Sequence, residues 1–144
     1  MKLKIAIVPN QSEDLIVYAR EKTPLLDKIC ELVKERENLF AAYRNDEITL
    51  LREEQIICFS IEDSKLYAYS ELGKMKLKER LCDVEELLGN SFVKINQSCI
   101  ANIKKIAKFD TSLAGSLIVV FNDGRRDYVS RRRLKYVKNK LGIK

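Results

Sequence analysis

Apolar residues at the start of the chain fall on every second position. Leu3, Ile5 and Ile7 alternate with polar or small residues until Pro9, and this period of two predicts a strand with one buried face. We expect a second apolar run, over residues 15–19, to form the hairpin partner of that strand. The pattern therefore predicts a small β structure at the N-terminus.

The spacing then changes to that of a helix over residues 24–36. Thr23 offers an N-cap, and Pro24 suits the first helical position. The apolar residues that recur on one face are Leu25, Leu26, Ile29, Cys30, Leu32 and Val33. We expect this stripe to be buried against the first strands, the rest of the chain or a second subunit.

From residue 39 onward, short apolar segments alternate with turn residues at about 8 to 12 positions, which is typical of a mainly β fold. Strands are predicted at residues 39–44, 47–51, 55–61, 66–70, 74–78, 92–95, 104–109, 116–121 and 125–129. Asp123 and Gly124 mark a hairpin between the last two strands. Short helices are predicted at residues 79–88 and from Ser130, as N-cap, to Gly142.

Length and composition limit the domain organisation. The chain has 144 residues, of which 46% are hydrophobic, enough for one packed core but not for two full domains. The boundary candidate near residue 38 predicts an extension over residues 1–40 before a domain over residues 41–144. No apolar run reaches the length of a membrane span or signal sequence, and a cytoplasmic location is expected.

The chemistry of the side chains argues against an enzyme. The four cysteines, at positions 30, 58, 82 and 99, form no CxxC pair, and the chain has no histidine. A zinc set and the commonest general base are therefore both missing. The sequence also contains no phosphate-binding glycine motif and no nucleophile motif. We predict no catalytic site, no cofactor, no metal and no small-molecule substrate.

Positive charge is concentrated toward the C-terminus. Residues 1–72 carry 10 basic and 14 acidic side chains, whereas residues 73–144 carry 17 basic and 7 acidic ones. Residues 91–144 alone hold 13 basic and 3 acidic side chains. Such segregation steers polyanions toward one end of a molecule, and a nucleic acid is the first candidate partner.

The most basic segment begins a helix, at Ser130, Arg131, Arg132, Arg133 and Lys135. Cations in a first helical turn face the positive end of the helix dipole and cost about 0.3 to 1 kcal/mol each. A solvated basic surface is the simpler interpretation. Arginine in place of lysine favours an anionic partner, because its planar fork matches phosphate and the guanine edge.

A polar triplet interrupts the apolar segment over residues 92–106. Asn96, Gln97 and Ser98 lie where the alternation breaks, which is typical of an ordinary turn. The same triplet could present two amides and a hydroxyl from a loop, and Asn or Gln pairs with adenine through two hydrogen bonds.

These two segments together resemble the LytTR family of bacterial DNA-binding domains. Residues 92–102 follow the first family signature with two departures, because Asn96 stands where His or Ser is usual and Gln97 replaces a basic residue. The second signature, a hairpin followed by Ser-Arg and a helix, is matched by residues 123–134. Residues 56–62 resemble the family's strand that ends in glutamate, and the likeness covers about residues 43–143.

The resemblance implies an elongated, mainly β DNA-binding domain with short helices, preceded here by a small β-helix extension. It implies a transcriptional regulator that inserts loops into successive major grooves of tandem repeats in double-stranded DNA. The implied contacts are Ser64, Lys65, Asn96, Gln97, Ser98, Arg131, Arg132, Arg133 and Lys135. The chain resembles short members without a receiver domain, which implies a homodimer on DNA and a small membrane protein as inhibitor.

Two other interpretations remain open. The acidic N-terminal region and its helix could be the functional surface of a protein-interaction or dimerisation module, with only non-specific nucleic-acid affinity. RNA binding is the third, although the strands lack the interleaved aromatic residues of single-strand platforms.

Overall fold

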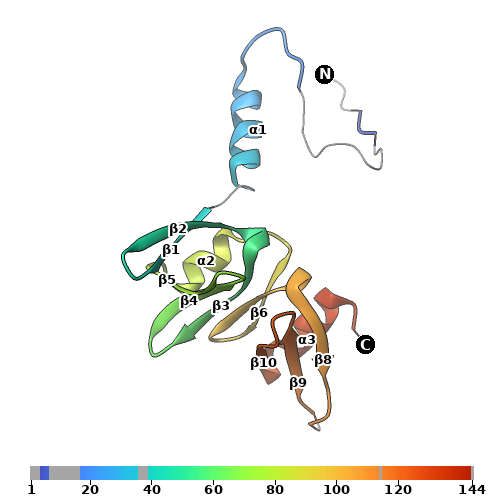
Figure 1. Ribbon diagram of the computed structural model, residues 1–144. Helices are drawn as coiled ribbons and strands as arrows, with labels where there is room; N and C mark the ends of the chain where they lie inside the picture. Colours follow the sequence, from blue (N-terminus) through green and yellow to red (C-terminus); the bar gives the residue numbers. More distant parts are fainter. Residues whose placement is uncertain (1–3, 7–16, 36–38, 114, 144) are drawn as a thin grey trace.

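The structure is a computed structural model that describes residues 4–6, 17–35, 39–113 and 115–143. Most of the described elements gather in two antiparallel sheets and the helices beside them (Figure 1). The predicted mainly β fold with short helices is confirmed. Within the described part of the chain, no helix combines the length and apolar character needed to cross a membrane.

The larger sheet has seven strands in the order β2-β1-β5-β4-β3-β7-β6. The strands are β1 Leu39–Arg44, β2 Glu47–Arg52, β3 Ile56–Glu62, β4 Lys65–Ser70, β5 Gly73–Leu77, β6 Phe92–Asn96 and β7 Cys99–Asn102, and helix α2, Leu81–Leu87, connects β5 to β6. All pairings are antiparallel. Asn45, with φ 54°, lies in the turn between β1 and β2, a left-handed conformation that short polar side chains tolerate.

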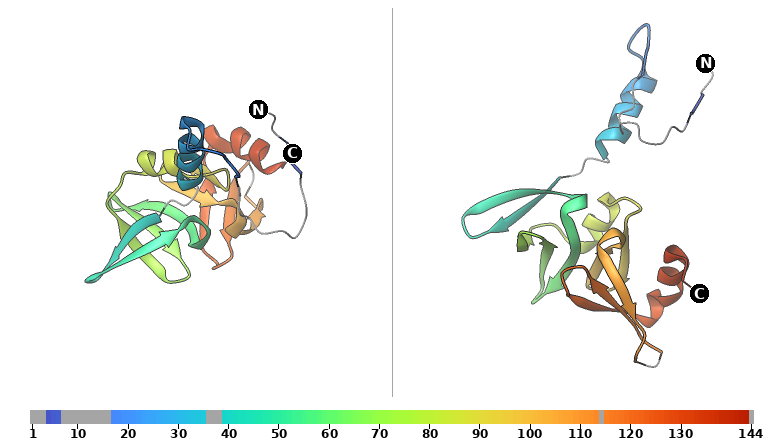
Figure 2. Two further views of the ribbon diagram at one scale, coloured as in Figure 1. Left: turned by 90° about the horizontal axis from the view of Figure 1, so that it is seen from above. Right: turned by 45° about the vertical axis from the view of Figure 1, so that its right-hand side comes forward.

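The smaller sheet has three strands in the order β10-β9-β8 and is followed by helix α3. Its elements are β8 Ile106–Asp110, β9 Leu117–Phe121, β10 Arg126–Val129 and α3 Arg131–Leu141, and single 3-10 turns occur at Glu53–Gln55 and Ile103–Lys105. The views in Figure 2 show this sheet and α3 beside the β6 end of the larger sheet. Gly124, with φ 90°, supplies the predicted hairpin between β9 and β10.

Apolar side chains form one core on each face of the larger sheet. The first core lies between the sheet and α2, where the Phe59 ring packs 5.2 Å from Phe40 and 5.9 Å from Phe92 between centroids. The second core joins β6 and β7 to the smaller sheet and α3, with Ile95 and Val137 fully buried. The two cores fix β6 between both sheets, so its ends are rigidly placed.

Helix α1, Pro24–Glu35, confirms the helix predicted near the N-terminus. Leu25 and Leu32 are 48% and 63% exposed, and Figure 1 shows α1 standing clear of both sheets. These two members of the apolar stripe are therefore not buried against the rest of the chain. Burial against a second subunit stays a prediction.

Two predictions about strands differ from the structure. Residues 4–6 and 17–19, expected to be parts of an N-terminal strand pair, carry no strand, and the other residues of those two runs lie outside the described residues. Strand β7 was not predicted, because its four residues are all buried and show no alternation. Burial on both faces removes the periodic signal of a strand.

Candidate nucleic-acid interface

The turn between β6 and β7 is the centre of the candidate site. Asn96 at the end of β6 pairs with Cys99 at the start of β7, which leaves Gln97 and Ser98 as the two turn residues. Both turn side chains are exposed. The polar triplet of the sequence is therefore a tight hairpin tip that presents one amide and one hydroxyl to solvent.

Asn96 lies behind that tip and is only 1% exposed. Its Nδ2 donates hydrogen bonds to Asp127 Oδ1 at 3.0 Å and to the Tyr128 carbonyl at 2.8 Å. Its Oδ1 accepts a hydrogen bond from the Ser98 N–H at 2.8 Å. The amide is thus used within the domain, where it joins the β6–β7 turn to β10.

The turn between β3 and β4 lies on one side of this tip. Asp63 and Ser64 adopt left-handed backbone angles, with φ 50° and 64°, as in a two-residue hairpin turn of the type that matches strand twist. The Ile61 N–H donates to the Ser98 carbonyl at 2.8 Å, which joins the two hairpins. Figure 1 shows both tips pointing the same way, with Ser64 and Lys65 exposed.

The start of α3 lies on the other side of the tip. The Ser130 N–H donates to the Ile95 carbonyl at 2.9 Å, and Arg133 Nε donates to the Lys94 carbonyl at 2.9 Å. Ser130 occupies the N-cap position, but its side chain makes no capping hydrogen bond. Both contacts fix the first turn of α3 against β6.

The basic side chains of α3 divide into anchored and exposed ones. Arg133 is anchored through Lys94, and its guanidinium carbon lies 4.4 Å from the centroid of the Tyr136 ring. Arg131, Arg132 and Lys135 are exposed. Among the described residues, no ion pair or hydrogen bond is formed by these three side chains. They are available to an anion.

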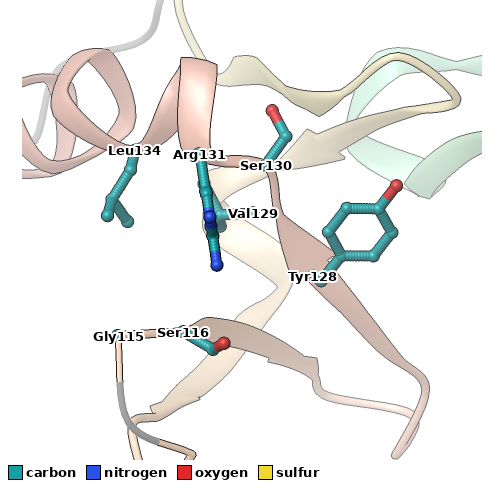
Figure 3. Close-up of a pocket in the computed structure, with 7 residues that line it drawn as sticks. All are labelled: Gly115, Ser116, Tyr128, Val129, Ser130, Arg131 and Leu134. Carbon is teal, nitrogen blue, oxygen red and sulfur yellow. The ribbon is translucent and has the colours of Figure 1, made fainter.

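A cavity of about 270 Å³ adjoins the start of α3. Figure 3 shows Arg131 extending from the helix toward Ser116, with Tyr128 on the neighbouring strand. Tyr128 is 55% exposed. This part of the surface therefore combines a free guanidinium with an aromatic ring and hydroxyls.

An ion-pair network holds the end of β3 in place. Glu62 Oε1 accepts a hydrogen bond from Arg125 Nη2 at 2.9 Å, and its carboxylate also accepts from Lys74 and Tyr69. Hydrogen bonds from Lys74, Tyr69 and Arg125 hold the pKa of Glu62 at about 2, although burial acts in the opposite direction. Because Arg125 follows the β9–β10 turn, the network links the two sheets next to the β3–β4 turn.

The structure brings the predicted site residues together on three adjoining segments, but it gives them different surroundings. Asn96 and Arg133 are occupied by contacts within the domain, whereas the other seven are exposed or lie on exposed turns. Sequence reasoning missed Lys76 and Lys94, which line a groove beside the β3–β4 turn. The alternation of Lys74, Met75, Lys76 and Leu77 was the signal for one of them, since it places lysines on one face of β5.

A mainly β domain that presents free cations and one exposed amide on three adjoining segments is suited to a large polyanion. A family model described as the LytTr DNA-binding domain matches residues 46–142, and the chain belongs to this LytTR family. Two relatives from Staphylococcus aureus, of strains NCTC 8325 and MSSA476, are 29% and 28% identical over 99% of both chains. Each bears the name uncharacterized HTH-type transcriptional regulator.

A solved structure supports the fold. A LytTr DNA-binding domain from Bacillus cereus matches with a TM-score of 0.71 at 21% identity, covering 74% of this chain and 99% of that one. The resemblance inferred from the two signatures is thus confirmed at the level of the family and the fold.

Proposed function

We propose that the protein is a transcriptional regulator that binds double-stranded DNA in a sequence-specific manner. The observation that carries the proposal is the joining of two hairpin tips and the start of α3 by hydrogen bonds around Gln97 and Ser98. Membership of a DNA-binding family, which is not an enzyme class, and relatives named as transcriptional regulators support it.

The proposed division of roles follows from exposure. Gln97 reads an adenine edge and Arg132 a guanine edge, because both are exposed and have the side chains that suit those edges. Arg131, Lys135, Ser98 and the β3–β4 turn contact the sugar-phosphate backbone. Asn96 and Arg133 hold the reading segments in place. The segments then enter successive major grooves of tandem repeats.

Selection of bound duplexes from a random pool tests this function directly. We expect a recurring sequence to emerge, and its affinity to fall with salt at a log–log slope of about −3.6 if four phosphates are neutralised. A protein-interaction module with only non-specific nucleic-acid affinity would enrich no sequence. That result would reject the proposal.

We further propose that residues 1–38, which precede β1, form an extension outside the DNA interface and contact a second copy of the chain. The exposure of Leu25 and Leu32 on α1 supports this role. Deleting residues 1–38 should leave the selected sequence preference intact and lower the number of chains per particle, as measured by light scattering. Loss of preference would place the extension in the interface, and an unchanged number of chains per particle would favour a different partner, such as an inhibitory membrane protein.

A further inference from the structure

A groove of about 630 Å³ runs along the surface beside the β3–β4 turn, on the face of the larger sheet that carries α2. Its lining includes five basic side chains and one acidic side chain. The basic ones are Lys65, Lys76, Lys78, Arg80 and Lys94, and the acidic one is Glu79. Three of the basic side chains come from residues 76–80, and the fold adds Lys65 from β4 and Lys94 from β6 to this basic segment.

Most of this charge is not neutralised within the domain. Arg80 forms an exposed ion pair with Asp83 at 3.7 Å, and the Lys78 ammonium lies 4.5 Å from the centroid of the Tyr43 ring. For Lys65, Lys76 and Lys94, no anionic partner exists among the residues that the structure describes. Lys74, by contrast, lies on the same strand as Lys76 and is paired with Glu62.

The floor of the groove is apolar. Ile61, Leu66, Leu77 and Leu81 line it beneath the basic side chains. A free inorganic anion would gain nothing from such a floor. A strand of DNA offers both matching features, because its phosphates are spaced about 3.4 Å apart along the helix axis and its deoxyribose rings are largely apolar.

The groove is also continuous with the proposed reading surface. Gln97 and Ser64, which belong to the two hairpin tips, line the same groove. Lys94 and Lys65 line this groove with Gln97, so phosphates next to a base at Gln97 are within the same groove as these two ammonium groups. We propose that the groove binds the sugar-phosphate backbone of the DNA that flanks the recognised bases. This inference rests on the proposed function and extends it to residues that lie outside the two family signatures or carry no assigned role.

The test uses the full chain with Lys76→Gln and Lys94→Gln combined, which removes two charges and retains polar side chains. Binding is measured against salt by fluorescence anisotropy, with the selected duplex and a random duplex. We expect the double variant to bind both duplexes more weakly by the same factor. Its log–log salt slope should be smaller in magnitude by about 1.8, which corresponds to two lost phosphate contacts.

A shortened duplex locates the contact. Removing half a helical turn, about 5 base pairs, from one flank should weaken binding by the wild type but not further weaken binding by the double variant. Lys108→Gln removes one positive charge from an exposed position on β8 outside the groove, and it should leave the effect of shortening the flank unchanged. A circular dichroism spectrum and melting curve equal to those of the wild type establish that each variant is folded.

The outcomes separate this inference from the proposed function. If the wild type selects a sequence but the double variant keeps the full salt slope, the groove does not hold phosphates, and an acidic protein segment becomes its better occupant. If the double variant loses binding only to the selected duplex, the groove reads bases and the inference is wrong. If the wild type selects no sequence at all, the proposed function itself fails.

Discussion

Replacing Arg132 by alanine is expected to remove about 1 to 3 kcal/mol of binding free energy on the selected site and little on random DNA. The physical reason is that a guanidinium can bind the O6 and N7 atoms of guanine through two hydrogen bonds, which no other base pair offers in the same geometry. Anisotropy titrations with both duplexes measure the change. A selection repeated with the variant should show relaxed preference at one base position.

Arg132 is favoured over its two neighbours by the structure of α3. Successive helical residues point about 100° apart, so three arginines in a row cannot enter one groove together. Arg133 is held by the Lys94 carbonyl and lies over the Tyr136 ring. Arg131 borders the cavity beside Tyr128. Arg131 and Arg132 are both exposed, and Arg132 is the one of the two that does not line this cavity.

Lys135→Ala serves as the matched control for Arg132→Ala. Lys135 is exposed on the same helix, and an ammonium contacts phosphate as a point charge without reading sequence. This variant should weaken binding to both duplexes alike and reduce the salt slope by about one. If Arg132→Ala gave that same pattern, the start of α3 would be an electrostatic clamp and not a reader of bases.

Local turn chemistry explains which parts of the fold could be predicted from the sequence. The hairpins at Asn45 and Gly124 adopt left-handed backbone angles that few residues tolerate, so short signals located them correctly. Strand β7 lacks such a signal, because every residue from Cys99 to Asn102 is buried. Periodicity reports only elements with one face in water.

The site was predictable in its location but not in its division of roles. The two family signatures identified the β6–β7 turn and the start of α3, and the structure places them side by side. The partners of the Asn96 amide, Asp127 and Tyr128, lie more than 30 positions away in sequence, so its burial could not be read from its neighbours. The groove beside Lys94 was missed for a related reason, since Lys65 and Lys94 join the basic segment of residues 76–80 only through the fold.

The burial of Asn96 makes it the residue whose substitution should lower the stability of the fold most directly. Asn96→Ala removes two donated hydrogen bonds and one accepted hydrogen bond from a site that is 1% exposed. Buried polar groups left without partners cost about 1 to 3 kcal/mol each. Asp127 is partly open to water, so its carboxylate can replace the lost hydrogen bond with one from water. We expect the free energy of unfolding to fall by about 2 to 4 kcal/mol.

Urea denaturation followed by circular dichroism measures this loss, with Gln97→Ala as the matched control. Gln97 is the next residue along and is exposed, so its truncation should change the free energy of unfolding by less than about 0.5 kcal/mol while relaxing DNA sequence preference. The two adjacent amides are thus expected to have opposite effects, one on stability and one on recognition. If Asn96→Ala were as stable as the wild type but lost its preference for the selected duplex, this division of roles would be contradicted. Asn96 would then have to leave its buried position to contact a base, and the β6–β7 turn would be a segment that rearranges on binding DNA.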